Sequence, residues 1–223
     1  MGNTGLGGVY IADAGISYKM ICLHLLDLAY RDVHDAHVVN SDWDENAISE
    51  VLANSINTNT ETIQHHITAI VEKRMLSGDL YLAPTTVDDA PRIDIMIGGF
   101  GMDRNTEYRE ACYMEAKNLY SYDFTKTGHK SKISSTFYAK RYIATGIDNI
   151  LKGHYPGDTL LLGYVLNGTI DSAVDKINVN LASDSRQSES IKMQIGEDFP
   201  NLVFGRSAHP TGVEIMHCYL LFI

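Results

Sequence analysis

The chain has 223 residues, of which 44% are hydrophobic and 21% are charged, a composition typical of one globular domain with a substantial core. Its net charge of −10 argues against a general polyanion-binding protein. No apolar run approaches the roughly 18 residues that span a membrane, no signal peptide is apparent, and the 3 cysteines are widely separated. We therefore expect a cytoplasmic protein without a membrane partner, a disulfide framework or a cysteine zinc site.

Hydrophobic periodicity predicts three helices in the first third of the chain, at residues 18–34, 45–57 and 61–76. Ser41 and Asp44 are the candidate N-caps of the second helix, and Thr60 is the expected N-cap of the third. The elements predicted after them are strands at 92–98 and 111–118, a helix at 135–152, a strand at 159–166, a helix at 170–181 and a terminal hairpin within 201–222. This order predicts an α/β sandwich around a central mixed β-sheet.

The chain is expected to form a single domain over residues 1–223. Within it, residues 1–44 are predicted to be an N-terminal helical extension and residues 45–182 the core. Residues 183–223 are predicted to be a loop followed by the C-terminal β-hairpin.

The two strands at 92–98 and 111–118 carry charges at positions where a strand is usually apolar. Asp94 lies among isoleucines, and Glu115 and Lys117 share one face of the second strand. Buried charges need partners or a metal, because leaving them unpaired is costly. If the strands pair as a hairpin, both carboxylates and the lysine meet at one spot, an arrangement suited to a hard divalent cation beside an activated water. The alternative is an ordinary cross-strand ion pair of Lys117 with one of the carboxylates.

Basic residues are concentrated directly after this strand. Residues 116–152 hold 7 basic and 2 acidic side chains, whereas residues 1–90 hold 4 basic and 13 acidic side chains. A locally positive strip beside a carboxylate cluster suits a phosphate-containing substrate. The alternative is a solvated charged face.

Asp94, followed 21 positions later by Glu115-Ala116-Lys117, resembles the motif of the PD-(D/E)XK nuclease superfamily. The predicted strands at both halves of the motif and the basic helix downstream extend this resemblance over roughly residues 45–182. Segments 141–148 and 162–165 also resemble uncharacterised bacterial members of the group. The chain departs from the family pattern in that Pro91 stands three positions before the aspartate instead of beside it. The resemblance implies a restriction-endonuclease-like α/β/α sandwich.

The resemblance also implies roles for the motif residues. Asp94, Glu115 and the carbonyl of Ala116 would bind Mg²⁺ or Mn²⁺, and Lys117 would orient or deprotonate the attacking water. Family members often add a glutamate from the preceding helix. Glu72 is the preferred candidate and Glu50 the alternative.

Nucleic-acid contacts are expected from the basic segment. Arg141 is the best candidate for a bidentate phosphate contact, with Lys140 and Tyr142 beside it on the predicted helix. The non-specific backbone contacts are expected from Lys126, Lys130 and Lys132.

The sequence thus predicts a metal-dependent nuclease that hydrolyses phosphodiester bonds, a DNA endonuclease of the restriction or phage-defence type. Its expected partners are nucleic acid and either a second copy of the chain or another subunit of a defence system. One alternative is a non-catalytic nuclease-like subunit that binds nucleic acid or protein, and another is a paired-carboxylate enzyme acting on a sugar. Ser207 and His209 have the spacing of a nucleophile pair, but no acid is placed beside them, and we expect His209 and His217 to be structural.

Overall fold

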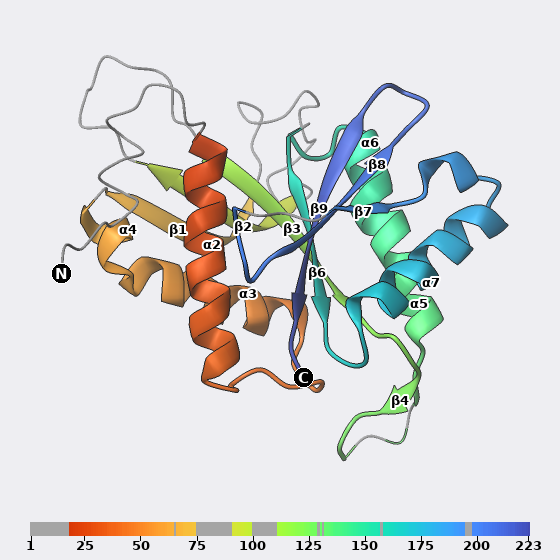
Figure 1. Cartoon of the computed structure of the whole chain (residues 1–223), viewed down its shortest axis with the longest axis horizontal. Coiled ribbons are helices and arrows are strands. Elements are labelled where there is room, and N and C mark those ends of the chain that lie inside the picture. The colour runs from red at the N-terminus through yellow and green to blue at the C-terminus, as the bar shows by residue number, and fades with distance from the viewer. Residues whose placement is uncertain are drawn as a thin grey trace.

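The chain folds into a central β-sheet with helices on both faces (Figure 1). The structure is a computed structural model that describes residues 18–64, 66–74, 91–99, 111–128, 130, 132–156, 158–194 and 198–223. The first 17 residues of the predicted N-terminal extension lie outside these ranges. The prediction of an α/β fold with a central mixed sheet is confirmed.

The sheet has seven strands in the order β1-β2-β3-β6-β9-β8-β7. Its middle is parallel, because β3 pairs with β6 and β6 with β9 in the same direction. The outer pairs on both sides are antiparallel. The strands are β1 (Ile67–Arg74), β2 (Arg92–Gly99), β3 (Ala111–Leu119), β6 (Leu160–Val165), β7 (Lys192–Gln194), β8 (Val203–Ala208) and β9 (Glu214–Leu221). The short strands β4 (Phe124–Thr125) and β5 (Lys132–Ile133) pair separately and project from the body (Figure 1).

Two groups of helices cover the sheet. One face carries α2 (Tyr18–Asp35) and α3 (Glu45–Thr58), which the short α4 (Thr60–Gln64) follows. The other face carries α5 (Ser135–Arg141), a π-helical segment (Tyr142–Ile147), α6 (Asp148–Leu151) and α7 (Ile170–Ser183). The predicted helix at 135–152 is therefore a run of three consecutive helical segments, the middle one π-helical.

The core lies in two layers, one on each side of the sheet. Leu26 of α2 and Ile56 of α3 belong to the first layer, together with Leu162 of β6. Ile177 of α7 and Leu161 of β6 belong to the second layer. All six residues of β6 are buried, which explains its uninterrupted apolar sequence: a central parallel strand is covered on both faces.

The predicted helix at 61–76 is wrong. The helix α4 ends at Gln64, and Ile67–Arg74 forms the edge strand β1, paired antiparallel with β2. His66 has a positive φ of 53° and marks the break between the two. Ile67, Ala69 and Val71 also fit the period of a strand, and the pairing satisfies the backbone groups of β1 that face β2.

The C-terminal hairpin is confirmed as β8 and β9. The predicted loop over residues 183–198 contains the 3-10 turn Gln187–Glu189 and the short edge strand β7. In the described part of the chain, no helix is both long enough and apolar enough to cross a membrane.

Candidate active site

The strands β2 and β3 separate at Asp94. Their ladder runs from Gly98↔Ala111 to Ile95↔Met114. Two positions beyond Met114, the Ala116 backbone N–H donates to Asp94 Oδ2 at 2.6 Å, so the aspartate side chain takes the place of a strand partner. Asp94 thereby lies against the Glu115-Ala116-Lys117 segment, as the sequence predicts.

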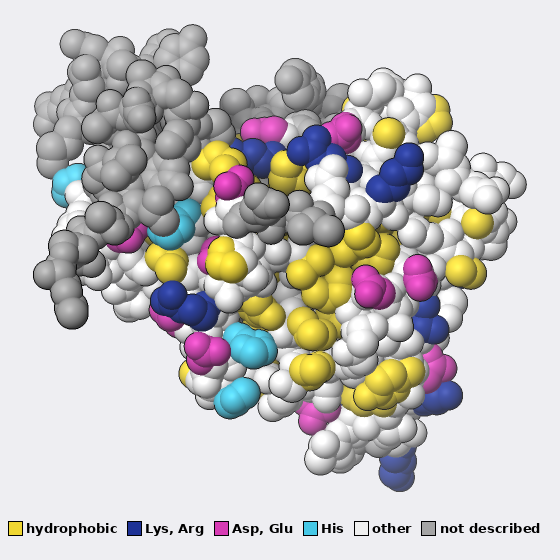
Figure 2. Space-filling view, viewed as in Figure 1, with side chains coloured by type: hydrophobic (Ala, Val, Ile, Leu, Met, Phe, Trp, Pro, Cys, Tyr) yellow, Lys and Arg dark blue, Asp and Glu magenta, His cyan; other side chains and the backbone are white. Residues whose placement is uncertain are grey.

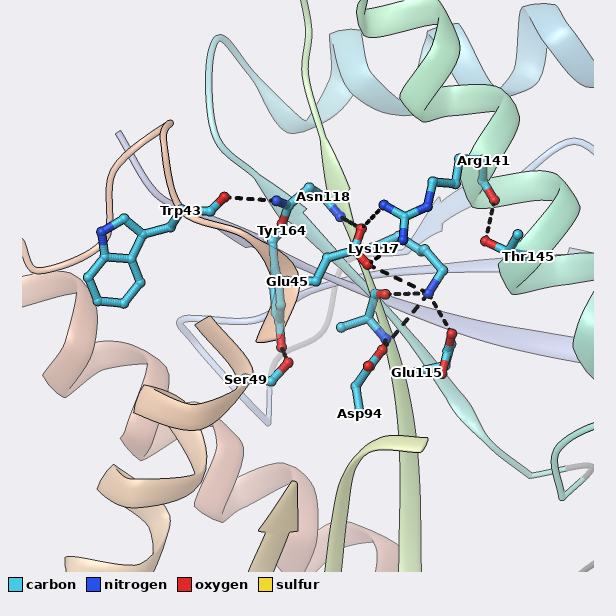
Figure 3. A network of polar contacts seen from close by, with 11 residues as sticks. Trp43, Glu45, Ser49, Asp94, Glu115, Lys117, Asn118, Arg141, Thr145 and Tyr164 are labelled. Atoms are coloured by element: carbon cyan, nitrogen blue, oxygen red, sulfur yellow. Dashed lines mark hydrogen bonds and ion pairs between the residues drawn. The ribbon is translucent and has the colours of Figure 1, made fainter. Parts of the chain in front are cut away.

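Lys117 is the centre of the resulting cluster (Figure 3). Its Nζ lies 2.5 Å from Glu115 Oε1 and 2.7 Å from the Ala116 carbonyl oxygen. The same Nζ is 3.9 Å from Asp94 Oδ2 and 3.9 Å from Glu45 Oε2. The Lys117 side chain is only 6% exposed, so three carboxylates surround one buried ammonium group.

The two strand carboxylates are shifted toward their protonated forms. Burial is the main cause that raises the pKa of Glu115 to about 8, and the charge of Asp94 adds to it against the opposing effect of Lys117. Burial also raises the pKa of Asp94, opposed by Lys117 and by the Ala116 N–H. A cation that replaced the bound proton would favour the ionised form of both groups.

Glu45 is the site residue that the sequence interpretation missed. It is the first residue of α3, where Asp44 caps the helix by accepting from the Ala47 N–H at 2.8 Å. The Asn118 N–H donates to Glu45 Oε1 at 3.0 Å. Arg141 donates to both oxygens of Glu45, at 2.8 and 3.0 Å. A charged residue at the start of a predicted helix usually faces solvent. Only the contact of Glu45 with β3 shows that it belongs to the site.

The structure does not place Glu72 on a helix before Asp94. Glu72 lies on β1 with a φ of 52°, and Arg92 Nη1 donates to its carboxylate at 2.9 Å. Its charge raises the pKa of Asp94 less than burial and the charge of Glu45 do. Glu50 is exposed on α3. The helical glutamate that reaches Lys117 is Glu45, not Glu72 or Glu50.

The residues predicted to contact nucleic acid fall into two groups. Lys130, Lys132 and Lys140 are exposed, and half-buried Arg141 contacts Glu45. Lys126 is also half-buried and donates to the Asp42 carbonyl at 2.9 Å, which joins the β4–β5 hairpin to the loop before α3.

Tyr142 is buried and does not reach the surface, contrary to its predicted role in binding. Its hydroxyl lies 2.8 Å from His217 Nδ1, inside the core between the π-helical segment and β9. The helix period shows that Tyr142 and Arg141 point in different directions but does not show which of them faces the sheet.

The donor atoms at the cluster fit a hard divalent cation. Among the described residues, no group of three or more His, Cys, Asp or Glu side chains is arranged to hold a metal ion. Magnesium needs fewer protein ligands, since it is commonly held by one or two carboxylates together with waters and substrate phosphates. Asp94 and Glu115 supply those carboxylates. Glu115 Oε2 is buried and has no partner within hydrogen-bond distance among the described residues.

A second buried network involves Ser207 and His209. Ser207 Oγ lies 2.8 Å from His209 Nε2, and His209 Nδ1 lies 2.6 Å from Glu189 Oε2, so Glu189 is the acid that the sequence did not place. His217 Nε2 also lies 2.8 Å from Ser207 Oγ. Ser207 is 1% exposed, and Arg186 holds the carboxylate of Glu189. The contacts of this serine are all with buried protein groups, which fits the structural role expected of both histidines.

No protein-family model matches the chain, and searches of curated proteins and of solved structures likewise return no match.

Proposed function

We propose that the protein is a metal-dependent phosphodiesterase that cleaves nucleic acid, with Asp94, Glu115 and Lys117 as its catalytic residues. The substrate class follows from the basic segment around Arg141, and DNA is the substrate to test first. The resemblance of the Asp94 and Glu115-Ala116-Lys117 motif to the PD-(D/E)XK nucleases supports the same reaction.

One observation carries the proposal: Lys117 Nζ lies within 3.9 Å of oxygens from Asp94, Glu115 and Glu45 in a buried cluster. These residues come from a helix and two strands, and the contact between Glu45 and Lys117 spans 72 positions of sequence. An exposed cross-strand ion pair stabilises a protein by only about 0–1 kcal/mol and would not need three carboxylates. A cluster of buried, mutually repelling acids is a frequent feature of functional sites, because it shifts pKa values at a cost in stability.

The reaction needs a positioned water and stabilisation of negative charge on the phosphoryl oxygens. A divalent ion held by Asp94, Glu115 and the Ala116 carbonyl would supply Lewis-acid stabilisation of the phosphate. Lys117 has three ammonium protons, and two of them are directed to Glu115 and Ala116 at hydrogen-bond distance. The third is available to orient the attacking water or to donate to a phosphate oxygen.

Glu45 and Arg141 act as positioning residues in this scheme. Glu45 adds a third negative charge near the Lys117 ammonium group. Arg141 neutralises Glu45 while its side chain stays 40% exposed, so the outer edge of the guanidinium remains open to a phosphate group.

Hydrolysis by the purified full-length protein tests the proposal. Supercoiled plasmid, a single-stranded DNA circle and a structured RNA are each incubated with Mg²⁺, with Mn²⁺ and with EDTA. We expect cleavage of at least one substrate with either metal and none with EDTA. If wild-type protein leaves all three substrates intact in every condition, the enzymatic proposal fails.

The main alternative is a non-catalytic nuclease-like subunit. The low exposure of the cluster and the pairing of Arg141 with Glu45 favour it, because these contacts are satisfied without any ligand. Calorimetric titration with Mn²⁺ separates the two functions. The enzyme should bind the ion and lose that binding in Asp94→Asn, whereas a structural ion-pair cluster should bind none.

A further inference from the structure

Two exposed aromatic side chains lie on the side of the molecule that carries the β4–β5 hairpin and the start of α5. Tyr122 is 57% exposed and Phe137 is 60% exposed. Among the large hydrophobic side chains exposed in the described part of the chain, these two alone are aromatic. Figure 2 shows a hydrophobic patch and Lys and Arg side chains at the lower right of the molecule, where Figure 1 labels β4 and α5.

The backbone of Tyr122 is fixed by contacts with the turn at Asn167 and Gly168. The Asn167 side chain accepts from the Tyr122 N–H at 3.3 Å and donates to the Tyr122 carbonyl at 3.1 Å. Gly168 has a φ of 69°, a conformation that favours glycine, and a Cβ added there would lie 3.4 Å from the Tyr122 ring. The turn that contains Gly168 therefore packs closely against Tyr122. Tyr122 therefore does not project from a loose loop.

Phe137 is the outer end of a chain of aromatic rings. Its ring centroid lies 5.5 Å from that of Tyr138 in an edge-on arrangement, and Tyr138 lies 4.7 Å from Tyr120. Tyr120 is 2% exposed and anchors the chain in the core. The rings of Tyr120 and Tyr138 thus support Phe137 from the core side and leave its outer face open to solvent.

The two aromatic residues belong to one surface. Asp123, next to Tyr122, accepts from the N–H and the hydroxyl of Ser135 at 2.8 and 2.7 Å, two residues before Phe137. The exposed basic side chains on the same elements are Lys130, Lys132 and Lys140. We call the set of Tyr122, Phe137, Lys130, Lys132 and Lys140 the aromatic–basic surface.

This surface leads to the candidate active site. Phe137 and Arg141 are four residues apart on α5 and therefore lie on the same side of that helix. Arg141 contacts Glu45 of the site. On the other flank, Lys126 of the hairpin contacts the carbonyl of Asp42, three residues before Glu45.

From this arrangement we infer that the aromatic–basic surface binds single-stranded nucleic acid and delivers it to the candidate active site. Proteins bind unpaired strands with exposed aromatic rings beside basic residues, because the bases stack on the rings and the cationic side chains contact the phosphates. In a duplex the base faces are already stacked on one another and are closed to such rings. The inference rests on the proposed function for its substrate class, and it narrows that class to unpaired DNA or RNA.

Binding without cleavage tests the inference independently of catalysis. The full chain carrying Glu115→Gln is titrated in EDTA against fluorescent 20-residue oligodeoxythymidine, oligouridine and a 20-base-pair DNA duplex. We expect tighter binding of at least one single strand than of the duplex. Phe137→Ala and Tyr122→Ala should each weaken single-strand binding by about tenfold and leave duplex binding unchanged.

Two further variants separate stacking from general hydrophobicity. Phe137→Trp keeps an aromatic face and should retain binding, whereas Phe137→Leu should lose it as Phe137→Ala does. Val179→Ala removes another exposed hydrophobic side chain, 67% exposed on α7, and is the control that should bind as the parent does.

The inference is overturned if the parent prefers the duplex, if it binds neither single strand, or if the Phe137 and Tyr122 variants bind as the parent does. None of these outcomes affects the proposed function, since a protein that fails here while cutting duplex plasmid is still a nuclease. Conversely, tight single-strand binding by a protein that cuts nothing would support the inference and contradict the enzymatic proposal.

Discussion

Arg141 on α5 holds the carboxylate of Glu45 on α3 through two hydrogen bonds, 2.8 and 3.0 Å long, across the edge of β3. The two helices lie on opposite faces of the sheet, so this pair connects the two helical layers beside the cluster around Lys117 (Figure 3).

Replacement of Arg141 by alanine should destabilise the protein. It leaves Glu45, whose side chain is 9% exposed, without its main counter-charge. The expected loss is about 1–3 kcal/mol in the free energy of urea unfolding. The double variant Arg141→Ala/Glu45→Gln should lose less than the two single variants together, because no unpaired charge remains. Additive effects would contradict the pairing, and Lys140→Ala, an exposed neighbour on α5, should leave stability unchanged.

Replacement of Lys117 should be more costly, because three carboxylates face its ammonium group. Lys117→Met is expected to lower the free energy of unfolding by about 3–5 kcal/mol near neutral pH. Lys152→Met, at an exposed position, is the matched control. An unchanged unfolding free energy for Lys117→Met would refute the buried cluster.

The motif residues could be predicted from the sequence because strand alternation alone places Glu115 and Lys117 on one face and Asp94 opposite its isoleucine neighbours. Glu45 could not be predicted, since its role depends on a contact with Asn118, 73 positions away. The start of α3 at Glu45 follows from its cap, but nothing local shows which residue of the first turn faces β3.

The secondary structure of the segment at 67–74 could not be predicted from local sequence either. Its apolar residues fit both a helical and an alternating pattern, and the pairing with residues of β2 that lie 18 to 32 positions later decides between them. That pairing moves Glu72 from a predicted helix to an edge strand, where Arg92 is its partner. The burial of Tyr142 likewise could not be predicted locally, because its hydroxyl partner is His217 on β9, far away in the sequence.

The buried histidine His217 should make stability depend on pH. Burial, with a further contribution from His209, lowers its pKa to about 3 from an ordinary value of 6.5. Between these values the unfolded chain binds a proton at His217 and the folded chain does not, so stability is lost as the pH falls through this window. The loss is up to about 1.4 kcal/mol per pH unit.

Urea unfolding of wild type and His217→Gln across this range isolates the contribution of this histidine. The stability advantage of the wild type should shrink as the pH is lowered. A difference between the two proteins that stays constant from neutral to acidic pH would contradict the assignment of a neutral His217 to the folded state.

Gly163 on β6 should not tolerate a side chain. Gly163 pairs with Lys117 across the ladder of β3 and β6. A Cβ at Gly163 would lie 2.6 Å from Tyr219 Cδ1 and 2.8 Å from Leu119 Cδ1. Gly163→Ala is expected to destabilise the protein by about 1–3 kcal/mol through overpacking. Thermal unfolding measures this, with Gly98→Ala as the control, because its nearest neighbour would lie at 3.5 Å, an ordinary contact distance. Equal melting temperatures for the two variants would show that β6 and β9 are not packed as described.

The central claim is that the cluster around Lys117 catalyses phosphodiester hydrolysis, and single-turnover cleavage of end-labelled DNA in Mg²⁺ tests it most directly. Glu115→Gln and Lys117→Ala, each first shown by circular dichroism to be folded, should cleave about 10²–10⁴-fold more slowly than wild type. Lys192→Ala, on the distant edge strand β7, should cleave at the wild-type rate. Folded Glu115→Gln and Lys117→Ala proteins that cleave as fast as wild type would contradict the account.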